Sequence, residues 1–300
     1  MTEFFQHLIN GIGVGSIYAL IALGYTMVFG ILQFINFAHG DVYMLGAYVG
    51  YYANRFFGLS QKPGLLSLSA ALLMSMITCG AVGYSIERFA YRPLRQAPKI
   101  NILITAVGVS LLLEFGGQLL FGADPQFFPT LYPSGDPLIF WGLQINRLQL
   151  MVFCIAVLLM LLLQVVIFRT KTGLAMRAVS FHRDTAALMG IPVNKTISAT
   201  FIIGSMLAGA AGILVGLNYP KIDPLMGVMF GLKAFVAAVV GGIGNVKGAV
   251  VGALIMGVAE SLVVGYLAST YRDALAFGLL ILILLVKPTG LFGRPSLEKV

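Results

Sequence analysis

Residues 148–168 read LQLMVFCIAVLLMLLLQVVIF and carry no acidic or basic side chain between Arg147 and Arg169. An α-helix needs about 20 mostly apolar residues to cross the hydrocarbon core of a bilayer, and this stretch meets that requirement. Comparable stretches recur along the whole chain, at Leu8–Leu32, Phe37–Ala53, Leu65–Ile86, Ile100–Phe121, Ile197–Leu217, Met226–Val240, Gly248–Leu267 and Ala274–Val286. The sequence therefore predicts a single all-α transmembrane domain over residues 1–300, a bundle of about eight or nine spanning helices.

Composition supports the same class. Of 300 residues, 59% are hydrophobic and 10% are charged. This composition is too apolar for a water-soluble protein, which buries its apolar side chains in a core beneath a polar surface. A membrane β-barrel is disfavoured because the apolar stretches are continuous and do not alternate. The cysteines Cys79 and Cys154 stand apart, without metal-ligand spacing, and we interpret them as small apolar residues.

Charge placement predicts the topology. The formal charge of +8 lies mainly in short loops, which favours a membrane orientation signal over nucleic-acid binding. Two loops are basic, Glu87–Lys99 and Arg169–Lys195, and together with the tail that carries Lys287, Arg294 and Lys299 we place them in the cytoplasm. The Pro-rich loop Gly122–Asn146 lies between them and is predicted to be external. No Lys or Arg precedes Arg55, unlike a cleaved signal peptide, so the first apolar stretch should be retained.

The stretch Asn36-Phe-Ala-His39-Gly-Asp41 interrupts the apolar pattern near the start. Ionisable groups at membrane depth are costly unless they face water or a partner. A helix broken here would place Asn36, His39 and Asp41 around a transport pathway. The alternative is a helix end at the membrane interface, with Asp41 as an N-cap-like residue for Val42 onward. Segment 37–53 is predicted to be a short or broken crossing, and the side of the N-terminus stays open.

Three further charges, Glu114, Lys233 and Glu260, lie within apolar segments. They are candidates for the substrate pathway, where a proton-coupled carrier would use the carboxylates as relays. The competing interpretation is structural: Lys233 and Glu260 pair within the bundle, or each side chain extends toward an interface.

Glycines Gly244, Gly248 and Gly252 recur every four residues and predict a smooth helix face for close packing. The sequence contains no phosphate-binding G-x-x-x-x-G-K-[ST] loop, no H-E-x-x-H and no G-x-S-x-G. We therefore expect no catalytic residues, no metal site and no cofactor bound by this chain, and any ATP must be used by another subunit.

The second basic loop mixes apolar and basic side chains in a pattern typical of short amphipathic helices that end at Gly190 and Pro192. Such a segment lies on a membrane surface or docks into a partner's groove, whereas an inert linker needs few apolar residues. We predict that residues 169–196 form a docking element.

Several motifs together resemble the permease subunits of ATP-binding-cassette (ABC) importers for branched-chain amino acids, of the LivH and BraD type. They are residues 35–47 (INFAHGDVYMLGA), 173–178 (GLAMRA), 231–237 (GLKAFVA), 241–244 (GGIG) and 287–293 (KPTGLFG), and the resemblance covers essentially the whole chain.

The resemblance implies a multi-pass protein of the bacterial inner membrane, working with a second related permease, two cytoplasmic ATP-binding subunits and a periplasmic amino-acid-binding protein. ABC permeases contact their ATPases through a loop that begins Glu-Ala-Ala-x-x-x-Gly, and residues 184–190 (DTAALMG) resemble it, with Asp for Glu and Thr for the first Ala. The later Ile-x-Leu-Pro part of that pattern is not found at its usual spacing. The implied coupling residues are Arg177, Arg183, Asp184, Ala186, Ala187 and Gly190.

Other functions stay open from the sequence. Permeases for urea or short amides resemble those for branched-chain amino acids in sequence. A self-contained carrier or channel would use Glu114, Glu260 and residues 36–41 to couple transport to ions or protons. An intramembrane enzyme is disfavoured because no nucleophile and base form a recognisable pair.

Overall fold

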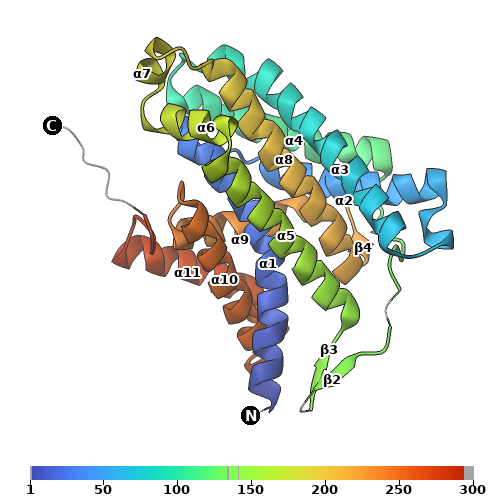
Figure 1. The fold of residues 1–300 in the computed structure, drawn as a ribbon. Helices are drawn as coiled ribbons and strands as arrows, with labels where there is room; N and C mark the ends of the chain where they lie inside the picture. Colours follow the sequence, from blue (N-terminus) through green and yellow to red (C-terminus); the bar gives the residue numbers. More distant parts are fainter. Residues whose placement is uncertain (1, 134, 141, 294–300) are drawn as a thin grey trace.

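The computed structural model describes residues 2–133, 135–140 and 142–293, so Arg294 and Lys299 of the basic tail lie outside the described residues. These residues form a bundle of α-helices (Figure 1). The helices are α1 (Thr2–Leu32), α2 (His39–Phe57), α3 (Leu65–Ile86), α4 (Lys99–Phe121), α5 (Arg147–Arg169), α6 (Lys171–Phe181), α7 (Arg183–Leu188), α8 (Val193–Asn218), α9 (Met226–Gly241), α10 (Val246–Tyr266) and α11 (Arg272–Val286). Short helical turns are η1 (Leu59–Gln61), η2 (Glu87–Tyr91), η3 (Arg92–Leu94) and η4 (Ser269–Tyr271).

Each predicted apolar segment coincides with a helix. Helix α3 has the predicted bounds, and the other helices differ from the predicted segments only near their ends. Among the described residues, seven helical stretches are long and apolar enough to cross a membrane. Helices α2 and α9, with 19 and 16 residues, are the two remaining predicted segments. The prediction of a polytopic helical membrane protein is confirmed.

Two long-range contacts define one end of the bundle. The Gln6 side chain donates to the Gln144 carbonyl oxygen at 2.8 Å, which places the start of α1 beside the Pro-rich loop. The Tyr51 hydroxyl donates to Gln126 Oε1 at 3.2 Å, which places the end of α2 beside the same loop. Helix α1 therefore runs away from that loop and α2 returns to it. A helix of 19 residues is about 28 Å long, which agrees with a short crossing.

The chain breaks between α1 and α2, where the sequence predicts an interruption. Helix α1 ends at Leu32, and Gln33 takes a positive φ of 55°, which few residues other than glycine adopt. The alternative interpretation holds in so far as two helices end here, but its assignment of Asp41 as an N-cap is wrong, because α2 already begins at His39. Asp41 lies in the first turn of α2, and its carboxylate faces Ser110 on α4.

Short β-pairs involve the Pro-rich loop and the connection between α8 and α9, where no strand was predicted. Strand β1 (Gln126–Phe127) pairs antiparallel with β4 (Lys221–Ile222), and β2 (Leu138–Phe140) pairs antiparallel with β3 (Leu143–Ile145). Strands of two or three residues carry too little alternation to be recognised in a sequence. In Figure 1, β2, β3 and the N-terminus lie at the bottom, while α6 and α7 lie at the top.

Helices α1 and α8 form the buried centre of the bundle. Glycines allow close contact: a Cβ on Gly248 or Gly252 would collide with the backbone of α9 at Gly241, and one on Gly257 would collide with α1 at Gly15. Gly244 does not belong to this helix face, and its predicted role is wrong. It lies in the turn before α10 with a φ of 91°, so the four-residue spacing is coincidental there.

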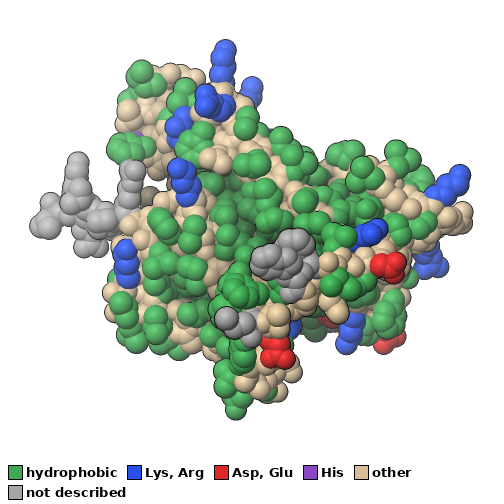
Figure 2. Space-filling model, turned by 60° about the horizontal axis from the view of Figure 1, so that its bottom comes forward, with side chains coloured by type: hydrophobic (Ala, Val, Ile, Leu, Met, Phe, Trp, Pro, Cys, Tyr) green, Lys and Arg blue, Asp and Glu red, His purple; other side chains and the backbone are tan. Residues whose placement is uncertain are grey.

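The outer helices carry large exposed apolar side chains, as a surface in contact with lipid requires. They include Leu112 and Leu119 on α4, Leu161 on α5 and Leu285 on α11. Hydrophobic side chains cover most of the face seen in Figure 2. The lipid-facing surface is therefore built from the helices packed around α1 and α8.

Candidate functional site

Asn36 anchors the break between α1 and α2. Its Oδ1 accepts a hydrogen bond of 2.6 Å from the Tyr91 hydroxyl, and both side chains are buried. The Tyr91 ring meets Phe34 edge-on, with 5.2 Å between ring centroids. The break is thus fixed to η2, at the end of α3.

His39 is buried within the helix bundle. Its ring lies edge-on to Tyr25 at a centroid separation of 4.9 Å, in space left by Gly24, where a Cβ would overlap the imidazole. Within the described residues, His39 Nε2 has no hydrogen-bond partner. A buried polar atom without a partner is costly, and such sites are often functional.

Asp41 and Glu114 meet through a serine. Ser110 Oγ donates to Asp41 Oδ2 at 2.5 Å and lies 3.3 Å from Glu114 Oε1. Asp41 is buried, and Glu114 is half-buried one helical turn after Ser110. The structure therefore brings two predicted pathway candidates together at the contact between α2 and α4.

Lys233 on α9 and Glu260 on α10 form an ion pair. The structural interpretation of the sequence expected this pair. Lys233 Nζ lies 3.3 Å from Glu260 Oε1 and 2.7 Å from Asp273 Oδ1. Glu260 Oε2 accepts a hydrogen bond of 2.8 Å from the Tyr18 hydroxyl. Arg272 Nε lies 3.0 Å from Glu260 Oε1, but its N–H is not directed at that oxygen and has no hydrogen-bond partner among the described residues. We call Lys233, Glu260, Arg272 and Asp273 the charge cluster.

Aromatic rings lie between the charge cluster and α2. The Phe230 ring is 6.0 Å from that of Tyr18, 5.6 Å from Tyr43 and 6.2 Å from Tyr219, measured between centroids. Tyr18 contacts the charge cluster, whereas Tyr43 is on α2 beyond Asp41. The six predicted pathway residues therefore form separate groups and not one continuous polar site.

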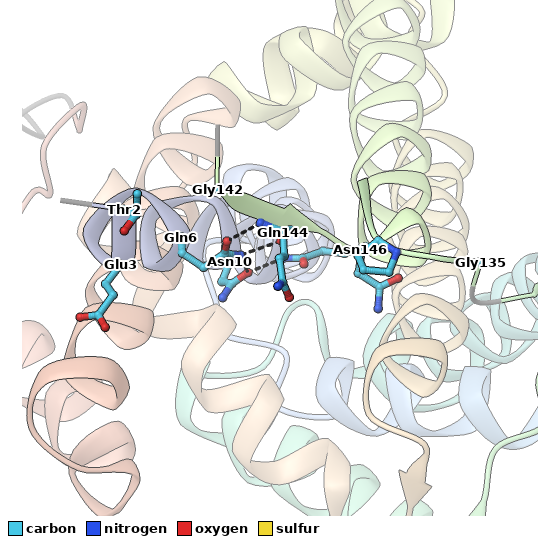
Figure 3. A pocket seen from close by; sticks show the side chains of 10 residues that line it. Thr2, Glu3, Gln6, Asn10, Gly135, Gly142, Gln144 and Asn146 are labelled. Carbon is cyan, nitrogen blue, oxygen red and sulfur yellow. Dashed lines mark hydrogen bonds between the residues drawn. The ribbon is translucent and has the colours of Figure 1, made fainter. Parts of the chain in front are cut away.

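Two adjoining cavities open at the end of the bundle that holds the N-terminus. The deeper one has a volume of about 330 Å³ and is lined by His7, Asn10, Val14, Gln149, Asn218, Tyr219, Gly257, Glu260, Ser261, Val264 and Arg272. The outer one, of about 580 Å³, lies between the start of α1 and the Pro-rich loop (Figure 3) and shares Asn10 and Gln149 with the first. Figure 3 shows Gln6 and Asn10 of α1 beside Gln144 of β3 in the wall of this outer cavity, with hydrogen bonds joining Gln6 to the Gln144 backbone.

The predicted docking segment folds into two short helices. Helix α6 begins after Thr170, whose Oγ1 accepts a hydrogen bond of 3.1 Å from the Gly173 backbone N–H. Helix α7 begins after His182. The chain leaves α7 through Gly190, which has a φ of 81°. Apolar side chains stand exposed along this segment at Phe181, Leu188 and Met189. Exposed apolar groups beside basic ones are typical of a docking surface.

The predicted coupling residues divide by exposure. Arg177, Asp184, Ala187 and Gly190 are exposed, and Ala186 is buried. Arg183 turns inward, and its Nη2 and Nε donate to the Ile31 carbonyl oxygen at 2.7 and 3.2 Å. Burial lowers the pKa of Arg183 from its ordinary value, and the charge of Asp184 opposes that effect. Arg183 thus caps the last turn of α1, just before the break.

A second link at this end joins α3 to α8. Glu87 is fully buried and forms an ion pair with Arg95. Its Oε2 also accepts a hydrogen bond of 2.5 Å from Ser198 Oγ. Arg95 also donates to Asn194 Oδ1 at 2.5 Å. Burial lowers the pKa of Arg95, and the Glu87 carboxylate opposes that effect. From the sequence, Glu87 and Arg95 were identified only as charges of a basic loop, and their buried contacts were not predicted.

Sequence reasoning missed Ser110, Tyr18 and Arg272, each of which contacts a predicted residue. Ser110 and Tyr18 carry no charge and so give no signal within an apolar stretch. The adjacent opposite charges Arg272 and Asp273 were a usable signal, because they stand directly before the last apolar segment.

Long apolar helices around a core that holds ion pairs and polar cavities define a multi-pass α-helical membrane protein. Residues 7–284 match the model of the family described as branched-chain amino acid transport system / permease component, and the chain belongs to this family.

Named relatives match nearly the whole chain. It is 44% identical to the high-affinity branched-chain amino acid transport system permease protein BraD of Pseudomonas aeruginosa, over 99% of this chain and 98% of that protein. It is 42% identical to the permease protein LivH of the corresponding Escherichia coli system, with the same coverage. The E. coli permease protein LivM is more distant, at 24% identity over 94% of this chain and 69% of LivM.

Proposed function

We propose that this chain is the transmembrane permease subunit of an ABC importer that moves leucine, isoleucine and valine across the bacterial inner membrane by alternating access. The observation that carries the proposal is the similarity to BraD and LivH, at 44% and 42% identity over almost the entire length of each protein. These relatives are named for branched-chain amino acids and not for urea or short amides, which favours the first substrate class.

The importer requires other chains. ATP hydrolysis belongs to two separate cytoplasmic subunits, in keeping with the missing phosphate-binding loop. A second permease completes the pathway; similarity of this chain to both LivH and LivM of E. coli supports a pair of related permeases. A periplasmic binding protein delivers the amino acid.

The docking surface for the ATPases is the α6–α7 segment, centred on Arg177–Gly190. Phe181, Leu188 and Met189 offer apolar contacts to a partner, and Arg177 supplies positive charge. Motion of α7 passes to α1 through the bond between Arg183 and the Ile31 carbonyl, and so reaches the break that contains Asn36.

The pathway uses the polar groups inside the bundle. Asp41 and Glu114 form one group, and Lys233 and Glu260 form another. His39, whose Nε2 has no hydrogen-bond partner in the part of the chain that the structure describes, lies where α2 begins. Polar groups that line a water-filled path avoid the cost of charge in lipid.

Substitution of the docking surface tests the proposal. Leu188→Glu places a charge on the exposed apolar face, and we expect the ATP-binding subunits to be lost on co-purification and leucine uptake by cells to cease. The matched control is Lys62→Glu, which adds an acidic side chain at an exposed position near the opposite end of the bundle and should change neither result. ATPase retention with normal uptake in Leu188→Glu would show that docking occurs elsewhere.

A further inference from the structure

The deeper cavity beside the charge cluster has the features of a small-molecule site. Its volume of about 330 Å³ lies within the range of about 300–1,000 Å³ that ligand pockets occupy. Its wall combines the acidic Glu260, the basic Arg272 and the imidazole of His7 with the amides of Asn10, Gln149 and Asn218. Convergent polar groups are what fix the orientation of a ligand bound in a pocket.

The charge cluster selects for a ligand without net charge. Lys233 and Arg272 supply two positive charges, and Glu260 and Asp273 supply two negative ones, so the cluster is balanced. A bound anion or cation would leave an uncompensated charge in a poorly solvated region, at considerable cost. A zwitterion adds no net charge and still offers both charges to the wall.

Arg272 is the group with unused hydrogen-bonding capacity. Its Nε–H is buried 3.0 Å from Glu260 and makes no hydrogen bond among the described residues, whereas the side chain as a whole is 38% exposed, so a ligand would meet the terminal amino groups of the guanidinium. A guanidinium binds carboxylates through two parallel hydrogen bonds. Glu260, in contrast, already accepts from Lys233 and Tyr18.

Other groups in the wall suit an ammonium group. Helix α8 ends at Asn218, and the last carbonyl groups of a helix carry partial negative charge. The side-chain oxygens of Gln149 and Asn218 are further acceptors, whereas that of Asn10 already accepts from Gln6 and Gln149. The ligand's positive end is therefore drawn toward the amides, while its carboxylate is drawn toward Arg272.

The rest of the wall accommodates an aliphatic side chain. Val14 of α1 and Val264 of α10 line the cavity together with Gly257, which allows α1 and α10 to touch. The outer cavity adjoins this one through Asn10 and Gln149, so the cavity has a polar route to the N-terminal end of the bundle.

We propose that this cavity binds the zwitterionic head group of an aliphatic α-amino acid, with Arg272 holding its carboxylate, before the substrate passes into the bundle. The inference rests on the proposed function and adds a substrate site near the end of the bundle opposite α6 and α7. It predicts that both charges of the ligand are needed for binding.

Ligand binding to the assembled permease and ATPase complex in nanodiscs, without the binding protein, tests the site. Radiolabelled L-leucine should bind saturably and be displaced by L-valine. Leucinamide, which lacks the carboxylate, and 4-methylpentanoate, which lacks the ammonium, should displace it at least about tenfold less well. Equal competition by either analogue overturns the zwitterion site.

Two variants locate the binding. Arg272→Gln should weaken leucine binding at least about tenfold, whereas Arg55→Gln, which removes an exposed charge at the C-terminal end of α2, should leave it unchanged. Val264→Phe fills the cavity from its apolar wall without altering the charge cluster, and it should abolish binding even if Arg272→Gln fails to assemble. Wild-type affinity in Val264→Phe would refute the assignment.

Uptake separates this inference from the proposed function. If the wild-type system imports leucine with ATP while the cavity variants bind leucine normally, the site is wrong and the function stands. If the wild-type system imports no branched-chain amino acid, the proposed function itself fails.

Discussion

Removal of the Glu260 carboxylate is the sharpest perturbation of the buried interior. Glu260→Gln keeps the size of the side chain but leaves Lys233 and Arg272 with only Asp273 to balance them. The Glu260 side chain is 5% exposed, and breaking a buried pair by removing one partner costs about 3–5 kcal/mol. Asp273 also bonds Lys233, but its side chain is 48% exposed, where an ion pair is worth about 0–1 kcal/mol.

Thermal unfolding of the purified complex in detergent, followed by size-exclusion chromatography, measures the difference. We expect Glu260→Gln to lower the midpoint temperature clearly and Asp273→Asn to change it little. The double variant Lys233→Met with Glu260→Gln should recover part of the loss, because the introduced amide then faces one fewer unpaired cation. If Glu260→Gln were as stable as wild type, or if Asp273→Asn were equally destabilised, the assignment of Glu260 as the centre of the cluster would be refuted.

Two further predictions concern transmission and packing. Arg183→Ala should leave the ATPase subunits bound but lower ATP-driven leucine uptake at least about fivefold, because it removes two charge-assisted bonds to the Ile31 carbonyl; unchanged uptake would contradict the transmission role. Gly257→Leu should lower the unfolding midpoint, because its Cβ meets α1 backbone and overpacking costs about 1–3 kcal/mol or more. Gly108→Leu is the control, since open space surrounds that position, and an equal loss there would argue against the packing role.

The sequence was sufficient to predict the helices and insufficient to predict which helices and side chains contact one another. Apolar length fixes a spanning helix directly, so α3 has the predicted bounds and α5 differs only at its ends. Pairing depends on which faces meet, and that information is spread over distant residues. Ser110 joins Asp41 to Glu114 across two helices, and although it stands one helical turn before Glu114, an uncharged serine does not reveal a contact with Asp41 on another helix.

The prediction for Gly244 shows a second limit. A regular glycine spacing looks helical, but positive φ angles at Gly242 and Gly244 make a turn there. Glycine serves both packing and turns, so its spacing alone does not distinguish them. Gly248 and Gly252, inside α10, do face the backbone of α9.

The most direct test of the proposed function is leucine uptake by proteoliposomes that contain this chain, the second permease, the ATP-binding subunits and the binding protein. We expect uptake only when ATP and all subunits are present, and none when this chain is reconstituted alone. Leucine uptake by this chain alone, driven by an ion gradient and independent of ATP, would contradict it.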